Sequence, residues 1–255
     1  MTRAAALIRA HAAALQRWQS PFHGFTSGHD PRSSDAALLV LTYGGLVHAA
    51  RHEWLNAGRR LIDRTYIDIL WHVQHLTAMR ACRAEQIAAA LDGFIRDRIA
   101  PLWDQLPGFG DMQKAELSKH WVADMAQHCF GSLRSELAAS RLLFFLCPML
   151  PLFNLSRGHL WALEQQGHSA AGDGYHAFAD AALGAYQELT ASLRALPRPT
   201  PSYGDPAQQA SIQVLLSQGD WWDRRVFDEL LRQTAADGGI TEQAFGCNAG
   251  GQMMH

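Results

Sequence analysis

The chain has 255 residues, of which 48% are hydrophobic and 18% are charged. This length and composition predict a globular protein with a buried core, and they exclude an intrinsically disordered chain. The formal net charge of −2 excludes a polycation of the histone type, although a local basic patch is enough for DNA binding. Only Lys114 and Lys119 are lysines, so any lysine chemistry has two candidates.

Apolar residues recur at spacings of three and four along almost the whole chain, which predicts helices. The first covers residues 2–19, and Ser34 or Asp35 caps a second that extends to about residue 50, with a break expected at 43–45. Further helices are expected at 51–80 (one long helix or two), 84–104, 112–129, 132–147, 156–167, 174–196, 207–217 and 221–235. Segments rich in Gly, Ser or Pro separate some of them at 20–34, 106–110 and 197–206.

One segment, residues 37–43 (ALLVLTY), fits a strand as well as a buried helix. The other patterns are helical, so the sequence predicts an all-α fold of roughly nine or ten helices. We expect one domain over residues 1–236, with lobes at 1–105 and 106–236, and a disordered glycine-rich tail at 237–255. No run of 18 apolar residues and no signal peptide is recognisable, so a cytoplasmic protein without a membrane partner is expected.

Histidine is the residue type that most suggests a metal, because the chain has thirteen. Two pairs have helical spacings that can bind one: His48 with His52, and His72 with His75. No ExxH carboxylate pair accompanies them, and the four cysteines form no CxxC. We therefore expect no metal and no cofactor, and a histidine-based metal enzyme is kept as a remote alternative. The GxSxG, GxxxxGK[ST] and GxGxxG motifs are also absent.

Residues 106–110 have the sequence LPGFG and are followed by Lys114. This turn resembles the hairpin of helix-hairpin-helix DNA-binding motifs, which is commonly Leu-Pro-Gly-x-Gly. Gly108 and Gly110 permit a tight turn with exposed N–H groups, and the next helix directs its N-terminus at a phosphate. The simpler interpretation is a Pro-Gly stop between two helices.

Residues 138–157 (AASRLLFFLCPMLPLFNLSR) resemble the core of the helix-hairpin-helix DNA glycosylase superfamily, in the branch with an 8-oxoguanine-glycosylase-like fold. In that family a Ser-Lys begins an apolar helix, a proline follows, and a Pro-x-x-Asp turn opens the next helix. Residues 221–231 resemble the closing helix of the same branch, so the resemblance covers roughly residues 100–235. The simpler interpretation is a buried core helix packed under a proline turn.

The resemblance implies a lysine that attacks the sugar C1′ and an aspartate that supports the oxocarbenium-like centre. This chain departs from the family at both positions, where it has Arg141 and Asn154. Arginine stays protonated and forms no Schiff base, which excludes β-lyase chemistry at that position. Asparagine takes no proton, but it can orient a water. Lys114 is the alternative nucleophile, although no aspartate follows it in the expected turn.

The resemblance therefore implies a DNA glycosylase that flips a modified or damaged base out of duplex DNA, and the missing lysine makes it monofunctional, so that water attack leaves an abasic site. Asn154 would orient the water, and Arg141 would hold a phosphate or the leaving base. The expected phosphate contacts are Gly108, Gly110, Lys114, Lys119 and Arg157. Candidate stacking residues, each more often found in a core, are Phe22, Phe25 and Trp71. The alternative is a non-catalytic helical DNA-binding or interaction protein of a mobile element.

Overall fold

The structure is a computed structural model that describes residues 2–19, 34–47, 57–58, 60–62, 84–130, 136–170, 172 and 174–240. These ranges contain nine α-helices and no strand, which confirms the predicted all-α fold. The helices are α1 (Arg3–Gln19), α2 (Asp35–Leu39), α5 (Ala84–Phe94), α6 (Asp111–Phe130), α7 (Glu136–Leu146), α8 (Arg157–Gln165), α9 (Gly174–Arg194), α10 (Pro206–Gln218) and α11 (Trp221–Asp237). Short π-helical or 3-10 turns lie at Val40–Gly44, Ile95–Ile99, Ala100–Leu102 and Leu106–Gly108.

Three helices begin where the sequence provides a capping side chain. Ser34 caps α2 and Ser156 caps α8, each through a hydroxyl that accepts a backbone N–H of the first turn. Asp205 caps α10 in a capping box with Gln208, and Pro206 takes the first helical position. These caps explain why the predicted starts of these helices agree closely with the structure.

The structure corrects several boundaries. Residues 37–43 are helical, and the chain stays helical through the expected break at 43–45, because a π-helical turn continues α2 there. A single helix over 51–80 is wrong, because Gly58 has a φ of 74° in a turn and Asp92 accepts the backbone N–H of Leu61. Helix α11 ends at Asp237, slightly later than predicted.

Several of the predicted features lie outside the described residues. They are most of the segment 51–80, the two histidine pairs, the stacking candidates Phe22, Phe25 and Trp71, and the tail beyond residue 240.

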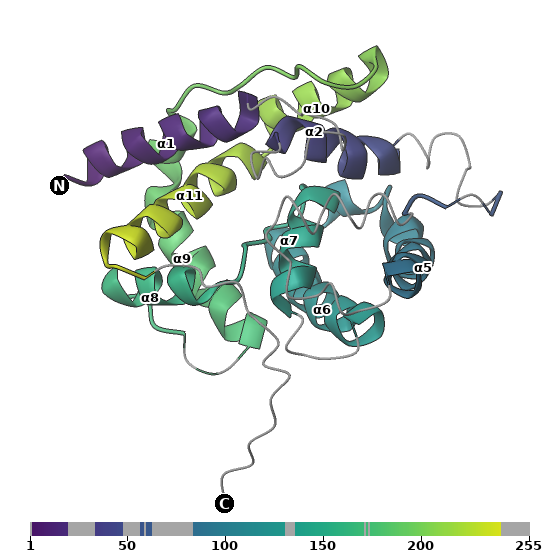
Figure 1. The fold of residues 1–255 in the computed structure, drawn as a ribbon, viewed down its shortest axis with the longest axis horizontal. Helices are drawn as coiled ribbons and strands as arrows, with labels where there is room; N and C mark the ends of the chain where they lie inside the picture. Colours follow the sequence, from purple (N-terminus) through teal and green to yellow (C-terminus); the bar gives the residue numbers. More distant parts are fainter. Residues whose placement is uncertain are drawn as a thin grey trace, which may run out of the picture.

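Helix α11 lies at the centre of one side of the molecule, where α1 and α8 pack against it (Figure 1). Helices α5, α6 and α7 pack together on the other side. Gly158 brings α8 close to α11, since a Cβ at this position would lie 3.0 Å from the Cβ of Ala235. Because α1 packs on α11 and α5 packs on α6, helices from both sides of residue 105 share one core.

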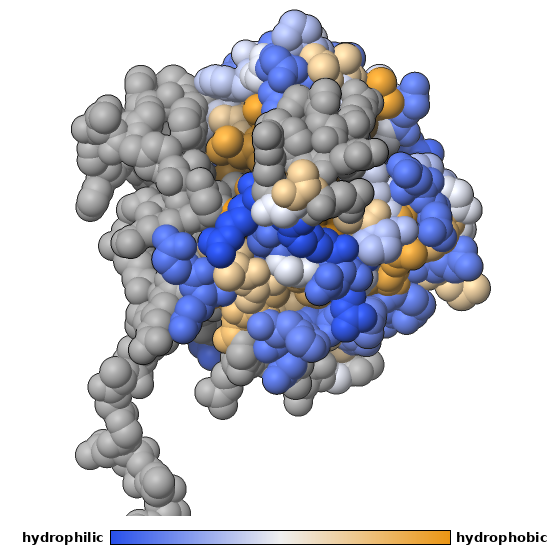
Figure 2. Space-filling view, turned by 90° about the vertical axis from the view of Figure 1, so that its right-hand side faces the viewer, coloured by the Kyte–Doolittle hydropathy of each residue, from blue (hydrophilic) through white to orange (hydrophobic). Residues whose placement is uncertain are grey.

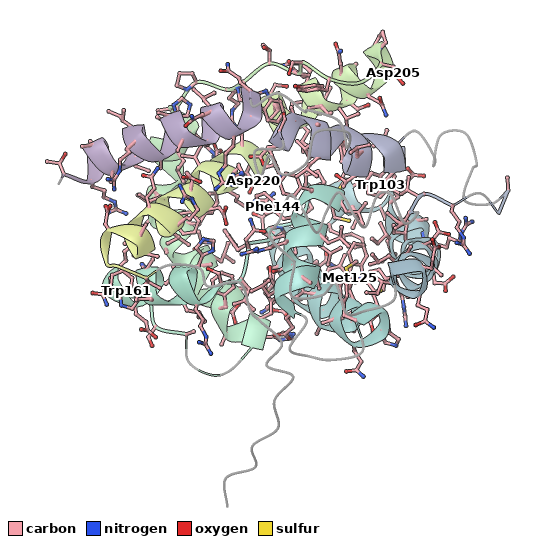
Figure 3. All side chains as sticks on the ribbon, viewed as in Figure 1. Trp103, Met125, Phe144, Trp161, Asp205 and Asp220 are labelled. Atoms are coloured by element: carbon pink, nitrogen blue, oxygen red, sulfur yellow. The ribbon has the colours of Figure 1, made fainter. Side chains whose placement is uncertain are left out.

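A cluster of aromatic rings joins the two sides of the molecule. Trp18 of α1 packs against Trp221 and Trp222 at the start of α11, and Trp221 in turn contacts Phe144 and Phe145 of α7. The indole N–H of Trp221 donates to the carbonyl oxygen of Phe144, so the one polar group of this buried ring has a hydrogen-bond partner. Phe144 and Asp220 accordingly lie near the middle of the molecule, where α7 approaches the start of α11 (Figure 3).

The coloured surface in Figure 2 is mostly hydrophilic, with apolar residues in smaller areas between polar ones. The large apolar side chains that are exposed in the described part lie on four different elements: Ile8, Leu41, Met112 and Val214. Single exposed apolar residues are normal and need no functional explanation. Of the helices in the described ranges, none is both long and apolar enough to cross a membrane.

Candidate functional site

The segment between α7 and α8 is held in place by three side chains from other parts of the fold. The Tyr175 hydroxyl accepts the N–H of Phe153, and the Ser140 hydroxyl accepts the N–H of Leu155. Arg224 donates to two carbonyl oxygens earlier in the segment. Asn154 therefore lies between two anchored backbone positions, so its side chain is presented by a rigid support although it is in a loop.

Asn154 is buried, with 7% of its surface exposed, and its side chain contacts α11. Its amide nitrogen donates to Oδ1 of Asp228 at 3.0 Å. Its amide oxygen is fully buried and has no hydrogen-bond partner among the residues that the structure describes. Buried polar atoms are nearly always paired in folded proteins, so this orphaned oxygen is unusual.

His159 lies in the first turn of α8 and is the second residue with an orphaned atom. Its Nδ1 is 2.6 Å from the backbone carbonyl oxygen of Asn154 and 3.6 Å from Oδ1 of Asp228. Its Nε2 is buried and has no partner within the described ranges. We name Asn154, His159 and Asp228 the α8–α11 polar site.

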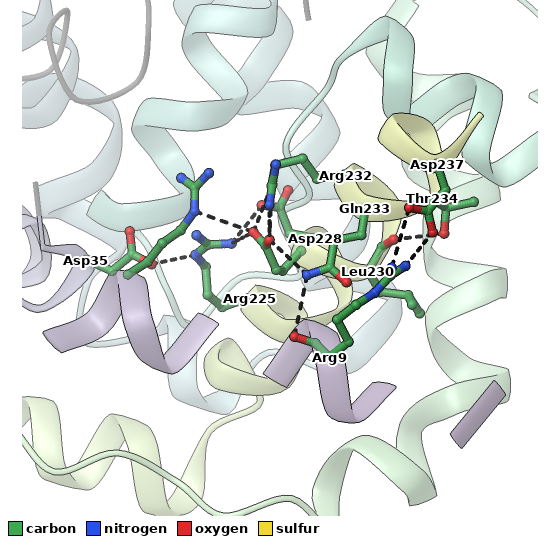
Figure 4. A network of polar contacts seen from close by, with 11 residues as sticks. Arg9, Asp35, Arg225, Asp228, Leu230, Arg232, Gln233, Thr234 and Asp237 are labelled. Carbon is green, nitrogen blue, oxygen red and sulfur yellow. Dashed lines mark hydrogen bonds and ion pairs between the residues drawn. The ribbon is translucent and has the colours of Figure 1, made fainter. Parts of the chain in front are cut away.

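Asp228 is anchored on its other side by Arg225, which is buried and donates to Oδ2 of Asp228 at 3.0 Å (Figure 4). Arg225 also donates to Asp35 of α2 at 2.6 Å. Burial alone would lower the pKa of Arg225, but the charges of Asp35, Asp228 and Glu229 outweigh it and raise the pKa. The guanidinium is therefore a fixed positive charge that orients the Asp228 carboxylate.

Glu229 is the centre of a second ionic network, which joins α11 to α1. Its side chain is fully buried and pairs with Arg232 and with Arg17. Burial raises the pKa of Glu229, but the hydrogen bond from Arg232 and the charges of Arg225 and Arg17 lower it by more. At the far end of the interface Arg9 pairs with Asp237 (Figure 4). This network fixes the position of α11 relative to α1.

Four further buried polar atoms have no partner in the described part of the chain: the Tyr186 hydroxyl, Oδ1 of Asp223, Nη1 of Arg198 and Oε1 of Gln233. Asp223 and Arg198 already form an ion pair at 3.0 Å. Burial, as the largest effect, raises the pKa of Asp223 and of Tyr186. This set combines donors and acceptors, whereas the two unpartnered atoms of the α8–α11 polar site are both acceptors.

The structure separates the sequence-predicted site residues into buried and exposed groups. Asn154 is in the α8–α11 polar site, and Arg141 is buried in α7. Arg157 is exposed at the start of α8, three residues after Asn154. Lys119 is buried, and its ammonium group forms ion pairs with Glu116 and Asp180. These carboxylates neutralise the positive charge that was predicted to contact a phosphate.

The 106–110 turn is exposed at its two glycines. A Cβ added to Gly108 would meet no atom within 4 Å, and one added to Gly110 would meet only the Gln113 side chain. Neither glycine has a positive φ. The turn itself therefore does not require glycine at these positions. Lys114 is partly exposed in the first turn of α6.

Metal and thiol chemistry find no support in the described residues. There, no three His, Cys, Asp or Glu side chains are grouped as a metal site would need. Burial raises the pKa of the Cys129 thiol to about 12 and raises that of Cys147 as well. Both thiols therefore stay protonated near neutral pH and are poor nucleophiles.

Comparisons with models of protein families, with curated proteins and with solved structures find no match to this chain. The resemblance to DNA glycosylases therefore depends on the sequence segments that carry it.

The sequence analysis found Asn154 but missed His159, Arg225 and Asp228. Asp228 lies 74 residues after Asn154, and nothing in the local sequence indicates that the two meet. The one available signal is the segment WWDRRVFDEL, in which charged residues alternate with large apolar ones. A helix of this composition buries part of its charge, which happens only when the charges are paired.

Proposed function

We propose that this chain is a monofunctional DNA glycosylase, which hydrolyses the N-glycosidic bond of a modified or damaged base in duplex DNA. One contact carries the proposal: the Asn154 amide donates to the Asp228 carboxylate at 3.0 Å. The resemblance predicts a carboxylate at residue 154, where this chain has an amide. Asp228 provides a carboxylate one hydrogen bond away, from a different helix.

The proposed roles follow from the charges of these groups. The Asp228 carboxylate, oriented by Arg225, stabilises the positive charge that develops at the sugar as the base departs. The amide oxygen of Asn154 accepts a hydrogen from the attacking water. Arg157, which is exposed, binds a phosphate beside the target nucleotide, and the exposed 106–110 turn binds a second one.

The chemistry is proposed to stop at base release, because no suitable amine is present at the site. Arg141 cannot form a Schiff base. The hydrogen bond that Lys119 donates to Glu116, the largest effect, raises the pKa of Lys119, which keeps this amine protonated and non-nucleophilic. Borohydride is therefore expected to trap no covalent protein–DNA adduct. An adduct that disappears in Lys114→Ala would show that the reaction uses Lys114 and that the site is misassigned.

The proposal is tested with labelled duplex oligonucleotides that each contain one modified base: an oxidised purine, an alkylated purine, a deaminated base or a hydroxymethylated pyrimidine. Hot alkali converts an abasic site into a strand break, so the expected result is cleavage only after alkali treatment, on at least one duplex. Strand breaks without alkali contradict the monofunctional mechanism. Salt-dependent DNA binding without release of any base contradicts the enzyme and favours the non-catalytic DNA-binding alternative.

A further inference from the structure

The orientation of the Asn154 amide is fixed by its partner. Asp228 is ion-paired with Arg225, and a carboxylate in an ion pair only accepts hydrogen bonds. The atom of Asn154 that faces it must therefore be the NH₂ group. The unpartnered atom is then the amide oxygen, which is an acceptor.

The same reasoning fixes the tautomer of His159. Its Nδ1 faces the backbone carbonyl oxygen of Asn154, which can only accept, so Nδ1 carries the hydrogen. In the neutral ring Nε2 then has a free lone pair and is an acceptor. This nitrogen is buried, and no described residue is its partner. The α8–α11 polar site thus has two orphaned atoms, and both are acceptors.

Two buried acceptors without a donor require a donor from outside the described residues. Water satisfies such acceptors, because it donates hydrogens and buried waters commonly bind polar groups left unpaired by the protein. A metal cation is disfavoured, because the Arg225 guanidinium lies 3.0 Å from the Asp228 carboxylate and repels a second positive charge.

We propose that His159 is a catalytic residue of this site: its Nε2 holds the attacking water and takes its proton. This inference rests on the proposed glycosylase function. The water oxygen forms a bond to the sugar C1′ as the C1′–N bond breaks and its electron pair leaves with the base. One water proton passes to Nε2, the hydroxyl stays on C1′, and solvent protonates the departed base.

Two substitutions separate the roles of the two ring nitrogens. His159→Asn keeps an N–H near the position of Nδ1, so it preserves the bond to the Asn154 carbonyl oxygen but removes the acceptor at Nε2. His159→Gln places an amide group near Nε2 and serves as the matched variant without the Nδ1 donor. A structural role for His159 predicts that His159→Asn is the milder change, whereas the proposed role predicts full loss of proton transfer in both.

The test compares single-turnover base release by the wild type and by His159→Asn, with thermal unfolding as the control for folding. We expect His159→Asn to keep the wild-type melting temperature within a few degrees and to release base about 100-fold more slowly, the usual contribution of a general base. Release at the wild-type rate by this variant overturns the role of His159 and leaves the proposed function intact. Absence of release by the wild type overturns the proposed function and this role together.

A second readout needs no substrate. Nitrogen-15 NMR of the histidine rings reports which nitrogen of His159 carries the hydrogen, and the proposal expects protonated Nδ1 with an unprotonated Nε2 that accepts a hydrogen bond. A ring protonated at Nε2 at neutral pH overturns the proposal, because that nitrogen then has no lone pair for the water proton.

Discussion

Two regions of α11, one helical turn apart, treat their buried charges differently. Arg224 is fully buried and donates to the carbonyl oxygens of Pro148 and Leu152 and to Asp220, so its donors are well satisfied. Asp228 is also well paired, yet the residues it contacts keep two atoms without partners. The same helix thus supports a completed polar cluster and an incomplete one.

The difference indicates what each cluster is for. A buried charge with all its hydrogen bonds made stabilises the fold only while every partner is present, and it has no donor or acceptor left to bind a ligand. An incomplete cluster of one polarity costs stability in the protein alone, so it persists where something else completes it. We therefore interpret Arg224 as the support of the 147–155 segment and the α8–α11 polar site as the functional group that this segment presents.

The largest expected effect is a loss of stability when the fully hydrogen-bonded cluster around Arg224 is broken. Arg224→Met leaves the carbonyl oxygens of Pro148 and Leu152 buried without donors, so we expect the free energy of unfolding to fall by about 3–5 kcal/mol. Chemical denaturation measures it. Arg3→Met, at an exposed ion pair, is the matched control and should change stability by less than about 1 kcal/mol. Equal effects of both variants would contradict the assigned role of Arg224.

The next largest effect is on the rate of base release, when Asn154 is removed from the α8–α11 polar site. Asn154→Ala deletes the orphaned oxygen and the donor to Asp228, so we expect the activation barrier for base release to rise by about 2–4 kcal/mol. The free energy of unfolding should fall by only about 1 kcal/mol, since Asp228 keeps its Arg225 partner. Single-turnover kinetics and denaturation measure the two quantities. A large loss of stability with little kinetic change would assign Asn154 to the scaffold.

The ionic network around Glu229 gives a pH dependence of known sign. The pKa of Glu229 is lowered in the folded protein, so its contribution to stability is present above the ordinary value of 4.5 and is lost as the pH falls through the folded value. Stability should fall below pH 4.5 with a slope that includes up to about 1.4 kcal/mol per pH unit from this group. Denaturation as a function of pH should show a smaller slope for Glu229→Gln; an unchanged slope would contradict this assignment.

The smallest expected effect concerns the exposed 106–110 turn. A Cβ added to Gly108, or to Gly93 in α5, meets no atom within 4 Å. We therefore expect Gly108→Leu and Gly93→Leu each to lose at most about 1 kcal/mol of stability, with unchanged helicity in Gly108→Leu. If a phosphate approaches the backbone at Gly108, only Gly108→Leu weakens duplex DNA binding, by about tenfold, as one lost contact would. Fluorescence anisotropy measures the affinity. Equal affinities of the two variants would identify the turn as a helix stop alone.

The helices were predictable because their signals are local. Capping residues such as Ser156 and Asp205 and the apolar spacing of three and four define an element within its own sequence. Residues 37–43 were ambiguous because every position from 35 to 39 is buried, which removes the periodic contrast between faces. Gly58 interrupts its segment through a left-handed backbone that the spacing does not reveal.

The candidate site was predictable only in part, because its contacts are long-range. Asn154 could be found from its place after a proline turn, whereas Asp228 and His159 acquire their roles from the packing of α8 on α11. Lys119 illustrates the opposite error: a lysine near a hairpin suggests a phosphate contact, but Asp180 of α9 already pairs with it. Charge alone does not indicate which groups the fold has already neutralised.

The most direct test of the central claim is base release by Asp228→Asn. The substitution keeps the shape of the side chain and one acceptor oxygen, but its NH₂ group replaces the second acceptor, so it removes the charge and one of the hydrogen bonds from Asn154 and Arg225. Release from the duplex that the wild type processes best, measured at equal concentrations of folded protein, should slow by about 100–1,000-fold, the scale of one preorganised electrostatic group. Release at the wild-type rate would show that the α8–α11 polar site is not where the bond is broken.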